Sequence, residues 1–155
     1  MFLYEAGDAW AMIWYAFLQD GTPTWYLGSA PAPTAEQGVW TVDLSRFTWN
    51  GTAAHGTGVG EALLTLVEPG RVTLSWNIDG QSGSEPMHWI DGGGCPDAAP
   101  RDLTGSWYAP SLSGYGYSIN AYPGLETNAA YFYDADGRAR WAFGASDGTG
   151  AVPLS

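Results

Sequence analysis

The sequence predicts an all-β fold, an antiparallel β-sandwich or barrel built of hairpins from a tandem repeat. Large rings carry its apolar content, with 9 Trp and 9 Tyr, while 22 Gly and 10 Pro divide the chain into short pieces. Aromatic residues favour strands, whereas Gly and Pro favour the turns between them. No stretch combines apolar residues at helical spacing with capping signals. Turn signals recur about every 8 to 12 residues, which predicts about ten or eleven strands.

The strongest strand signal lies at residues 71–78, where apolar and polar side chains alternate strictly. Alternation of this kind predicts a strand with one buried face. The segment ends at Asp79-Gly80, a dipeptide that accepts the positive φ angles of a tight hairpin turn. A return strand at residues 84–90 then completes a predicted three-stranded meander over residues 59–90.

The opening strand, residues 9–18, carries apolar side chains on both faces. Even-numbered side chains such as Trp10 and Trp14 share one face, and odd-numbered side chains such as Tyr15 and Phe17 share the other. A strand of this kind needs cover on both sides. We therefore expect a core on one side and a second sheet, another subunit or a ligand on the other.

Residues 14–28 and 130–144 share one pattern, in which an aromatic pair, Asp-Gly, Trp and Gly follow in the same order. A shared order at fixed spacing indicates an internal duplication. An offset of 116 positions pairs Tyr15 with Tyr131, Asp20 with Asp136, Gly21 with Gly137, Trp25 with Trp141, and Gly28 with Gly144.

The duplication divides the chain into three parts. Residues 1–90 form a β module that corresponds to the rear of one repeat unit, without the opening strand of that unit. Residues 91–102 are rich in Gly, Pro and Asp and lack bulky apolar side chains, which is typical of a linker. Residues 103–155 form the front half of a second unit, so the chain is out of phase with its own repeat.

Two motifs stand in residues 103–155, G-x-W-[WY]-x-P-x-x-S-G-x-G and Y-D-x-x-G-x-x-x-W. The first is carried by Gly105, Trp107, Tyr108, Pro110, Ser113, Gly114 and Gly116, the second by Tyr133, Asp134, Gly137 and Trp141, and later strands of the same pattern by Gly60, Leu64, Leu66 and Gly80. In these motifs the chain resembles an uncharacterised aromatic β-hairpin repeat of exported Gram-negative bacterial proteins. The resemblance implies an antiparallel β module made of hairpins, and it implies no activity and no catalytic residue.

Two arrangements would complete a chain that is out of phase with its repeat. In the first, residues 103–116 fold back onto residues 1–90 within one molecule. In the second, the C-terminal half-unit completes a neighbouring chain, because an exposed aromatic edge strand pairs readily with a partner. A third interpretation is that these residues are a piece of a longer array of units.

Charge and hydropathy exclude several classes of partner. The chain has no Lys, and 5 Arg against 16 Asp and Glu give a formal net charge of −11. Such a chain repels the phosphates of nucleic acid and of anionic membranes, and no apolar run approaches the roughly 20 residues that span a bilayer. The first residues lack the features of a secretory signal. The acidic, Trp-rich composition favours a mature or cut portion of an exported protein, extracellular or at the cell surface, over a cytosolic chain.

The sequence offers no catalytic constellation and no cofactor motif, so we expect a protein that is not an enzyme. Asp134 and Asp136 have the alternate spacing of a calcium loop, but the acidic ligands expected further along are missing, and a hairpin turn is favoured. His55, His88 and Cys95 lack the spacing of zinc ligands. Cys95 is either an unpaired thiol or the partner of a cysteine outside this sequence.

The surplus of aromatic residues points to two functions. We expect an exported structural or adhesive protein that associates with neighbouring copies of itself through aromatic strands, by strand complementation into a filament. The alternative is a carbohydrate-binding module, because exposed Trp and Tyr rings stack on the apolar faces of sugars. The residues expected to form the assembly or binding surface are Trp10, Ile13, Trp14, Tyr15, Phe17, Trp25, Trp107, Tyr108, Tyr131, Phe132, Tyr133 and Trp141.

Overall fold

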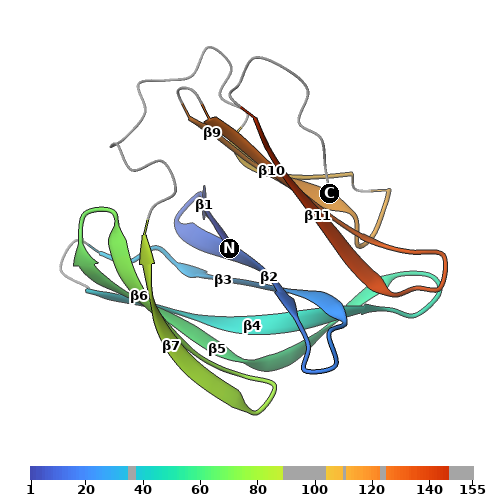
Figure 1. The fold of residues 1–155 in the computed structure, drawn as a ribbon, viewed down its shortest axis with the longest axis horizontal. Coiled ribbons are helices and arrows are strands. Elements are labelled where there is room, and N and C mark those ends of the chain that lie inside the picture. The colour runs from blue at the N-terminus through green and yellow to red at the C-terminus, as the bar shows by residue number, and fades with distance from the viewer. Residues whose placement is uncertain (35–37, 89–103, 110, 123–124, 147–155) are drawn as a thin grey trace. The chain divides into compact units, whose positions relative to one another are not determined.

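The computed structural model describes residues 1–34, 38–88, 104–109, 111–122 and 125–146. These residues form eleven strands in antiparallel sheets (Figure 1), which confirms the predicted all-β fold. Within them, no helix is long and apolar enough to cross a membrane. The predicted linker and Cys95 lie outside the described residues. In chain order the strands are β1 (Phe2–Ala6), β2 (Ala9–Phe17), β3 (Pro23–Pro31), β4 (Val39–Trp49), β5 (Ala54–Glu68), β6 (Arg71–Ile78), β7 (Gln81–His88), β8 (Gly105–Tyr108), β9 (Gly116–Tyr122), β10 (Leu125–Tyr133) and β11 (Ala139–Ser146).

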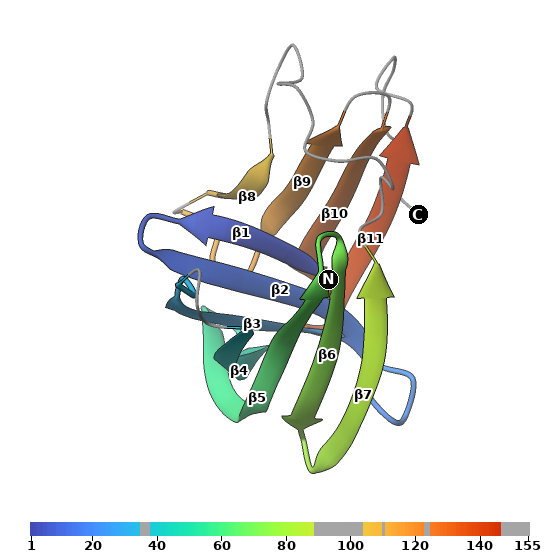
Figure 2. The same cartoon turned by 90° about the vertical axis from the view of Figure 1, so that its left-hand side faces the viewer.

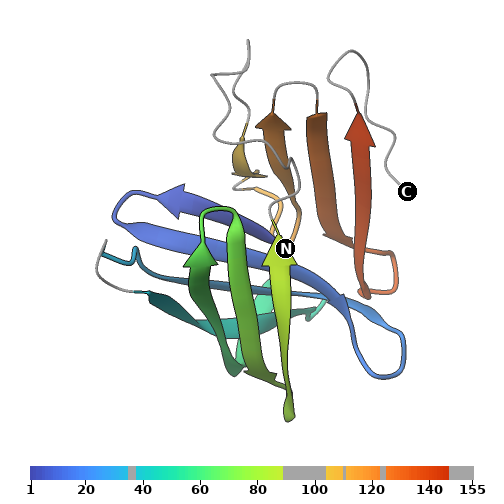
Figure 3. The ribbon, with the colours of Figure 1, turned by 60° about the vertical axis from the view of Figure 1, so that its left-hand side comes forward.

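The strands belong to two sheets. Strands β1 to β7 pair in chain order, each with the next, and form a strongly curled half-barrel (Figure 2). Strands β8 to β11 form a second sheet in the order β11-β10-β9-β8 (Figure 3). Trp107 of β8 lies opposite Tyr117 of β9. Residues 105–108 therefore pair with the segment that follows them, and among the described residues no ladder joins β8 to β1–β7.

Contacts group the chain into two compact units, each assembled from three stretches of sequence. The first unit comprises Met1–Trp14, Tyr26–Arg46 and Gly56–Gly92. The second unit comprises Tyr15–Trp25, Phe47–His55 and Gly93–Ser155. Strands β2 to β5 thus contribute residues to both units.

The first unit has an apolar core supplied by alternating strands. In β4 the side chains of Trp40, Val42 and Leu44 are buried, while those of the residues between them are exposed. The indole Nε1 of Trp40 donates a hydrogen bond to the backbone oxygen of Pro31 at 3.0 Å. The remaining large side chains of this core are Phe2, Tyr4, Met12, Ile13, Tyr26, Leu64, Leu74 and Ile78.

The predicted meander is confirmed as β5, β6 and β7 up to His88, while residues 89–90 lie outside the described residues, and the return strand begins at Gln81 instead of residue 84. Asp79 and Gly80 adopt φ angles of 53° and 75°, the left-handed turn that the dipeptide predicts. The carboxylate of Asp79 accepts hydrogen bonds from the Tyr26 hydroxyl at 3.0 Å and from the Arg46 guanidinium at 2.8 Å. The meander is therefore tied to β3 and β4 within the first unit.

Strand β2 is covered on both faces, as its two apolar faces predict. Met12 and Ile13 are adjacent in sequence and point to opposite faces, yet they are only 0% and 3% exposed. On the even-numbered face, the ring of Trp14 lies 6.0 Å from Tyr26 and 5.4 Å from Trp76. The odd-numbered residues beyond Trp14 belong to the second unit.

The 116-residue offset relates two groups of three strands, β1–β3 and β9–β11. The bounds of β2 and β10 differ by 116 at both ends. The ladders agree as well, because Phe2 lies opposite Ile13 in one group and Ser118 lies opposite Ala129 in the other. The two aligned segments therefore have the same strand register.

The turns after β2 and β10 also match. The backbone N–H of Gly21 donates to the oxygen of Leu18 at 2.9 Å, and that of Gly137 donates to the oxygen of Asp134 at 2.9 Å. Both glycines are left-handed, with φ angles of 79° and 74°, which a side chain would strain. We call β2–β3 the first hairpin and β10–β11 the second hairpin.

Candidate functional site

A cluster of aromatic side chains in the second unit joins the two hairpins, and we call it the aromatic interface. Its successive ring centroids lie 5.1 to 6.4 Å apart, the range of favourable aromatic pairs. Trp25 at its centre is 3% exposed, while Phe17 at its rim is 60% exposed. In order of contact the rings are Phe17, Trp141, Tyr15, Tyr131, Trp25, Tyr133 and Trp49.

The two hairpins meet reciprocally in this interface. The offset aligns Tyr15 with Tyr131 and Trp25 with Trp141. If each residue of a contact between the hairpins is replaced by the residue aligned with it, the result is a second contact between the hairpins. Each contact between the tryptophan of one hairpin and a tyrosine or phenylalanine of the other has such a counterpart, which is the approximate two-fold relationship of an interface between like partners. The related contacts are Tyr15–Trp141 at 6.0 Å with Tyr131–Trp25 at 5.4 Å, and Phe17–Trp141 at 5.2 Å with Tyr133–Trp25 at 5.1 Å.

Hydrogen bonds fix the rings in place. The hydroxyl oxygens of Tyr15 and Ser118 are 2.9 Å apart, and Ser118 is fully buried. The indole Nε1 of Trp141 donates to the backbone oxygen of Ala16 at 3.2 Å. Both bonds run between the first hairpin and the four-stranded sheet. Because polar groups left unpaired in such an apolar setting would be costly, the bonds favour one arrangement of the rings.

Two glycines of the S-G-x-G motif make room for two of the tyrosines. Gly114 is left-handed, with a φ of 74°, and a Cβ atom there would collide with the ring of Tyr133. A Cβ atom on Gly116 would collide with the hydroxyl end of Tyr131. These contacts explain why both positions of the motif are glycine in this chain, because larger residues would push both rings out of the aromatic interface.

The tyrosines of the interface are strongly biased toward their neutral form. Burial raises the pKa of the Tyr15 hydroxyl above its ordinary value of 10, and the bond to Ser118 offsets only part of this effect. Burial also raises the pKa of Tyr131, and it raises the pKa of Tyr133 to about 12. The rings are therefore uncharged near neutral pH, and they act as apolar contacts.

Half of the residues predicted for the assembly or binding surface meet in the aromatic interface, and others lie elsewhere. Trp10 packs on Trp40 in the first unit, with ring centroids 5.8 Å apart, and Ile13 and Trp14 also belong to that unit. Phe132 stands between two interface tyrosines in β10, so it points to the opposite face of the sheet. The interface residues predicted from sequence are Tyr15, Phe17, Trp25, Tyr131, Tyr133 and Trp141.

Two of the most exposed rings among the predicted surface residues lie in β8. Trp107 is 50% exposed and Tyr108 is 72% exposed. Because consecutive residues of a strand point to opposite faces, these two rings do not form a flat row. Trp107 instead shares its face with Tyr117, which lies opposite it in β9. Trp107 and Tyr117 are therefore neighbours on one face of the sheet.

Asp134 and Asp136 lie in a hairpin turn. The Oδ1 atom of Asp134 accepts hydrogen bonds from the backbone nitrogens of Arg138 and Asp136 at 2.9 and 3.0 Å. The Arg138 bond, assisted by the Arg140 guanidinium 2.8 Å away, lowers the pKa of Asp134. Among the described residues, no group of three or more His, Cys, Asp or Glu side chains could hold a metal ion. The turn uses its carboxylates to bind its own backbone and arginines.

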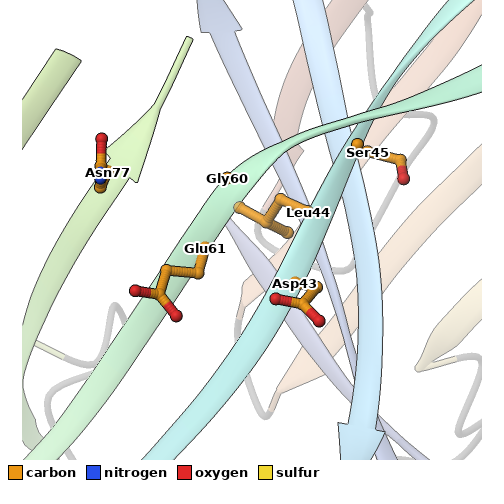
Figure 4. A pocket seen from close by; sticks show the side chains of 7 residues that line it. Asp43, Leu44, Ser45, Gly60, Glu61 and Asn77 are labelled. Atoms are coloured by element: carbon orange, nitrogen blue, oxygen red, sulfur yellow. The ribbon is translucent and has the colours of Figure 1, made fainter. Parts of the chain in front are cut away.

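A pocket of about 450 Å³ lies in the first unit, on β4, β5 and β6 (Figure 4). Asp43 and Glu61 bring two carboxylates to it from neighbouring strands, and Asn77 and Ser45 add polar groups. The described lining holds no Lys, Arg, His or Cys. Its negative character disfavours an anionic ligand.

Two residues of the interface region were not predicted from the sequence, Trp49 and Ser118. Trp49 closes the row of rings against Tyr133 at 5.6 Å. A signal for it exists, because the apolar positions of β4 change from even to odd numbers after Leu44, at Phe47 and Trp49, where the strand passes from the first unit to the second. No comparable signal marks Ser118, a small polar residue within an aromatic strand.

No family model, curated protein or solved structure matches the chain. Neutral rings with paired hydroxyl and indole groups can hold two β hairpins together, and they present no nucleophile activated by a neighbouring base.

Proposed function

We propose that the protein is an exported structural β module that joins neighbouring copies of itself through its aromatic hairpins. The reciprocal contacts of the aromatic interface support this proposal. There a hairpin of one kind is covered by a hairpin aligned with it residue by residue, as in Tyr15–Trp141 and Tyr131–Trp25. A second copy of the chain offers the same two hairpins, so it is a partner of matching shape and chemistry.

Burial of the rings holds the two hairpins together, whether they belong to one chain or to two copies. A large side chain that becomes fully covered contributes about 1.5–3 kcal/mol, and an aromatic pair adds about 0.5–1.5 kcal/mol. Where the two hairpins of one chain are apart, several rings covered by a second copy can therefore offset the loss of translational and rotational freedom on association, about 4–15 kcal/mol. The net charge of −11 opposes association, and salt weakens this repulsion by screening.

Sedimentation equilibrium at several protein concentrations, in low and high salt, tests the proposal. We expect an average mass above the 16.5 kDa of one chain, rising with protein concentration and with salt. Trp141→Ser, which removes an interface ring, should weaken association, while Tyr108→Ser, at an exposed position on β8, should not. A mass of 16.5 kDa under every condition would rule the proposal out.

A second candidate function, binding of a neutral carbohydrate, is favoured by one observation. Trp107 is half exposed and shares a sheet face with Tyr117, and paired rings of this kind can stack on a sugar. Titration with neutral oligosaccharides, followed by calorimetry, tests this candidate. Trp107→Ala should abolish the heat of binding, while Leu112→Ala, a change at another exposed apolar residue, should leave it intact.

A further inference from the structure

We infer that a second copy of the chain can supply β8 to β11 to the aromatic interface in place of the chain's own, which makes a domain-swapped dimer. The inference rests on the proposed function, because it names the way in which copies join. The exchanged part is the four-stranded sheet with the second hairpin. The receiving part is the first hairpin together with the end of β4, where Trp49 stands.

The exchange would break no strand pairing. In the described residues the backbone ladders of β1–β7 and of β8–β11 form two separate sheets, with no ladder from one to the other. The aromatic interface holds the two parts by ring contacts and by side-chain hydrogen bonds such as Tyr15–Ser118. A second copy can provide each of these contacts identically, because they involve no continuous strand.

The covalent connection between the two parts is long enough for exchange. Residues 89–103 connect them, and 15 residues reach at most about 50 Å when extended. Most of this stretch has the Gly, Pro and Asp composition typical of a linker. The connection therefore permits β8–β11 to cover either its own first hairpin or that of a neighbour.

The balance between the closed monomer and the swapped dimer depends on concentration. The contacts of the interface are the same in the monomer and in the swapped dimer. The free energies of these two forms therefore differ mainly because the linker ties the two parts of one chain together. A short linker gives its own partner an effective concentration on the order of millimolar. The closed chain is therefore favoured in dilute solution, and exchange grows when chains fold together at high concentration.

A designed disulfide across the second unit can report which copy supplies β8–β11. The backbone N–H of Ala54 donates to the Ser113 hydroxyl at 3.0 Å, and a Cβ atom on Gly114 would lie 3.2 Å from the Cβ of Ala54. The hydrogen bond places the Ser113 side chain directly against the backbone of Ala54, so we chose these two positions for the disulfide. The test protein carries Ala54→Cys and Ser113→Cys, with Cys95→Ser to remove the native thiol.

The test protein is refolded from denaturant at low and at high concentration, oxidised, and run on a non-reducing denaturing gel. The expected result is a disulfide within one chain at low concentration and a growing fraction of covalent dimer at high concentration. A matched control carries Ser75→Cys and Ser84→Cys, whose hydroxyls are 2.9 Å apart in the β6–β7 hairpin. Both control positions stay in one chain during the exchange, so this pair should give monomers at every concentration.

The possible results separate the inference from the proposed function. Oligomers in sedimentation without covalent dimers of the test protein would overturn the swap and leave the proposed function standing. A chain that stays monomeric in every condition would overturn both. Covalent dimers in the control as well as in the test protein would indicate random oxidation and count against the swap.

Complementation provides a second measurement that needs no new disulfide. Trp25→Ala damages the receiving part and Trp141→Ala damages the exchanged part. A swapped dimer of these two variants contains one interface with both changes and one with neither. Co-refolding at high concentration should therefore restore a thermal transition of wild-type midpoint in part of the material, and two unchanged variant transitions would contradict the swap.

Discussion

The hydroxyl oxygen of Tyr15 lies 2.9 Å from that of Ser118, a residue 103 positions further along the chain. Ser118 is fully buried, so the bond ties β2 to β9 at a place closed to water. Tyr133 in the same aromatic interface has a buried hydroxyl that finds no hydrogen-bond partner among the described residues. The two tyrosines thus share a setting and differ in one hydrogen bond.

Replacing each tyrosine by phenylalanine should therefore have different effects on stability. Tyr15→Phe removes a hydrogen bond and leaves Ser118 unpaired, so the free energy of unfolding should fall by about 1 kcal/mol. Tyr133→Phe removes a hydroxyl without a partner and should leave this free energy unchanged or raise it. Urea unfolding of the three proteins measures the difference, and equal losses in both variants would contradict the hydrogen-bond assignment.

The tryptophan at the centre of the aromatic interface should be the most sensitive to truncation. Trp25 is 3% exposed and contacts two tyrosine rings, so Trp25→Ala should lower the free energy of unfolding by about 3–5 kcal/mol. Tyr108→Ala changes a ring that is 72% exposed and should stay within about 0.5 kcal/mol. Denaturant unfolding distinguishes the two variants, and a similar loss in both would show that burial does not govern stability here.

Stability should fall in alkaline solution through the buried tyrosines. Burial raises the pKa of Tyr133 and of Tyr26 to about 12, above the ordinary value of 10. The unfolded chain loses these protons first as the pH rises, so their contribution to folding is intact below pH 10 and decreases from pH 10 to about 12. Urea unfolding at a series of pH values measures the slope. Tyr133→Phe should make the slope shallower, and an identical slope would count against this pKa.

Gly116 should not tolerate even one added carbon. A Cβ atom there would meet the Tyr131 hydroxyl and lie 2.7 Å from the backbone oxygen of Trp107, which cannot move without disturbing β8. Gly116→Ala should lower the free energy of unfolding by about 1–3 kcal/mol. Gly38→Ala is the matched control, because a Cβ atom at Gly38 meets nothing within 4 Å. Thermal unfolding of both variants checks the contrast, and equal midpoints would contradict it.

Alternation and turn chemistry were sufficient to predict most of the strands. The burial pattern of β4 and the left-handed turn at Asp79-Gly80 both follow from local sequence. The need for cover on both faces of β2 was also readable, because side chains alternate in a strand whatever surrounds it. These features depend on residues that are neighbours in the chain, so they can be predicted from the sequence.

The partner of each ring could not be predicted in the same way. The sequence shows that Tyr15 needs cover, but the cover comes from Tyr131 and Trp141, more than a hundred positions away. Sequence alone does not distinguish cover from the same chain from cover by a neighbour, since the side chains are identical in both. Ser118 illustrates the same limit: nothing about a serine between aromatic residues says which hydroxyl it will meet.

The odd-numbered face of β2 lies far in sequence from the residues that cover it, and this separation has a consequence for biosynthesis. The ribosome releases β2 early, when the residues that cover Tyr15 have not yet been made, and Ser118 follows only 103 positions later. Throughout that interval a ribbon of unshielded indole and phenol groups is present on the nascent chain. Such a chain is exposed to wrong pairing until β9 to β11 have been made, so its cell would benefit from keeping it bound to a chaperone during translation.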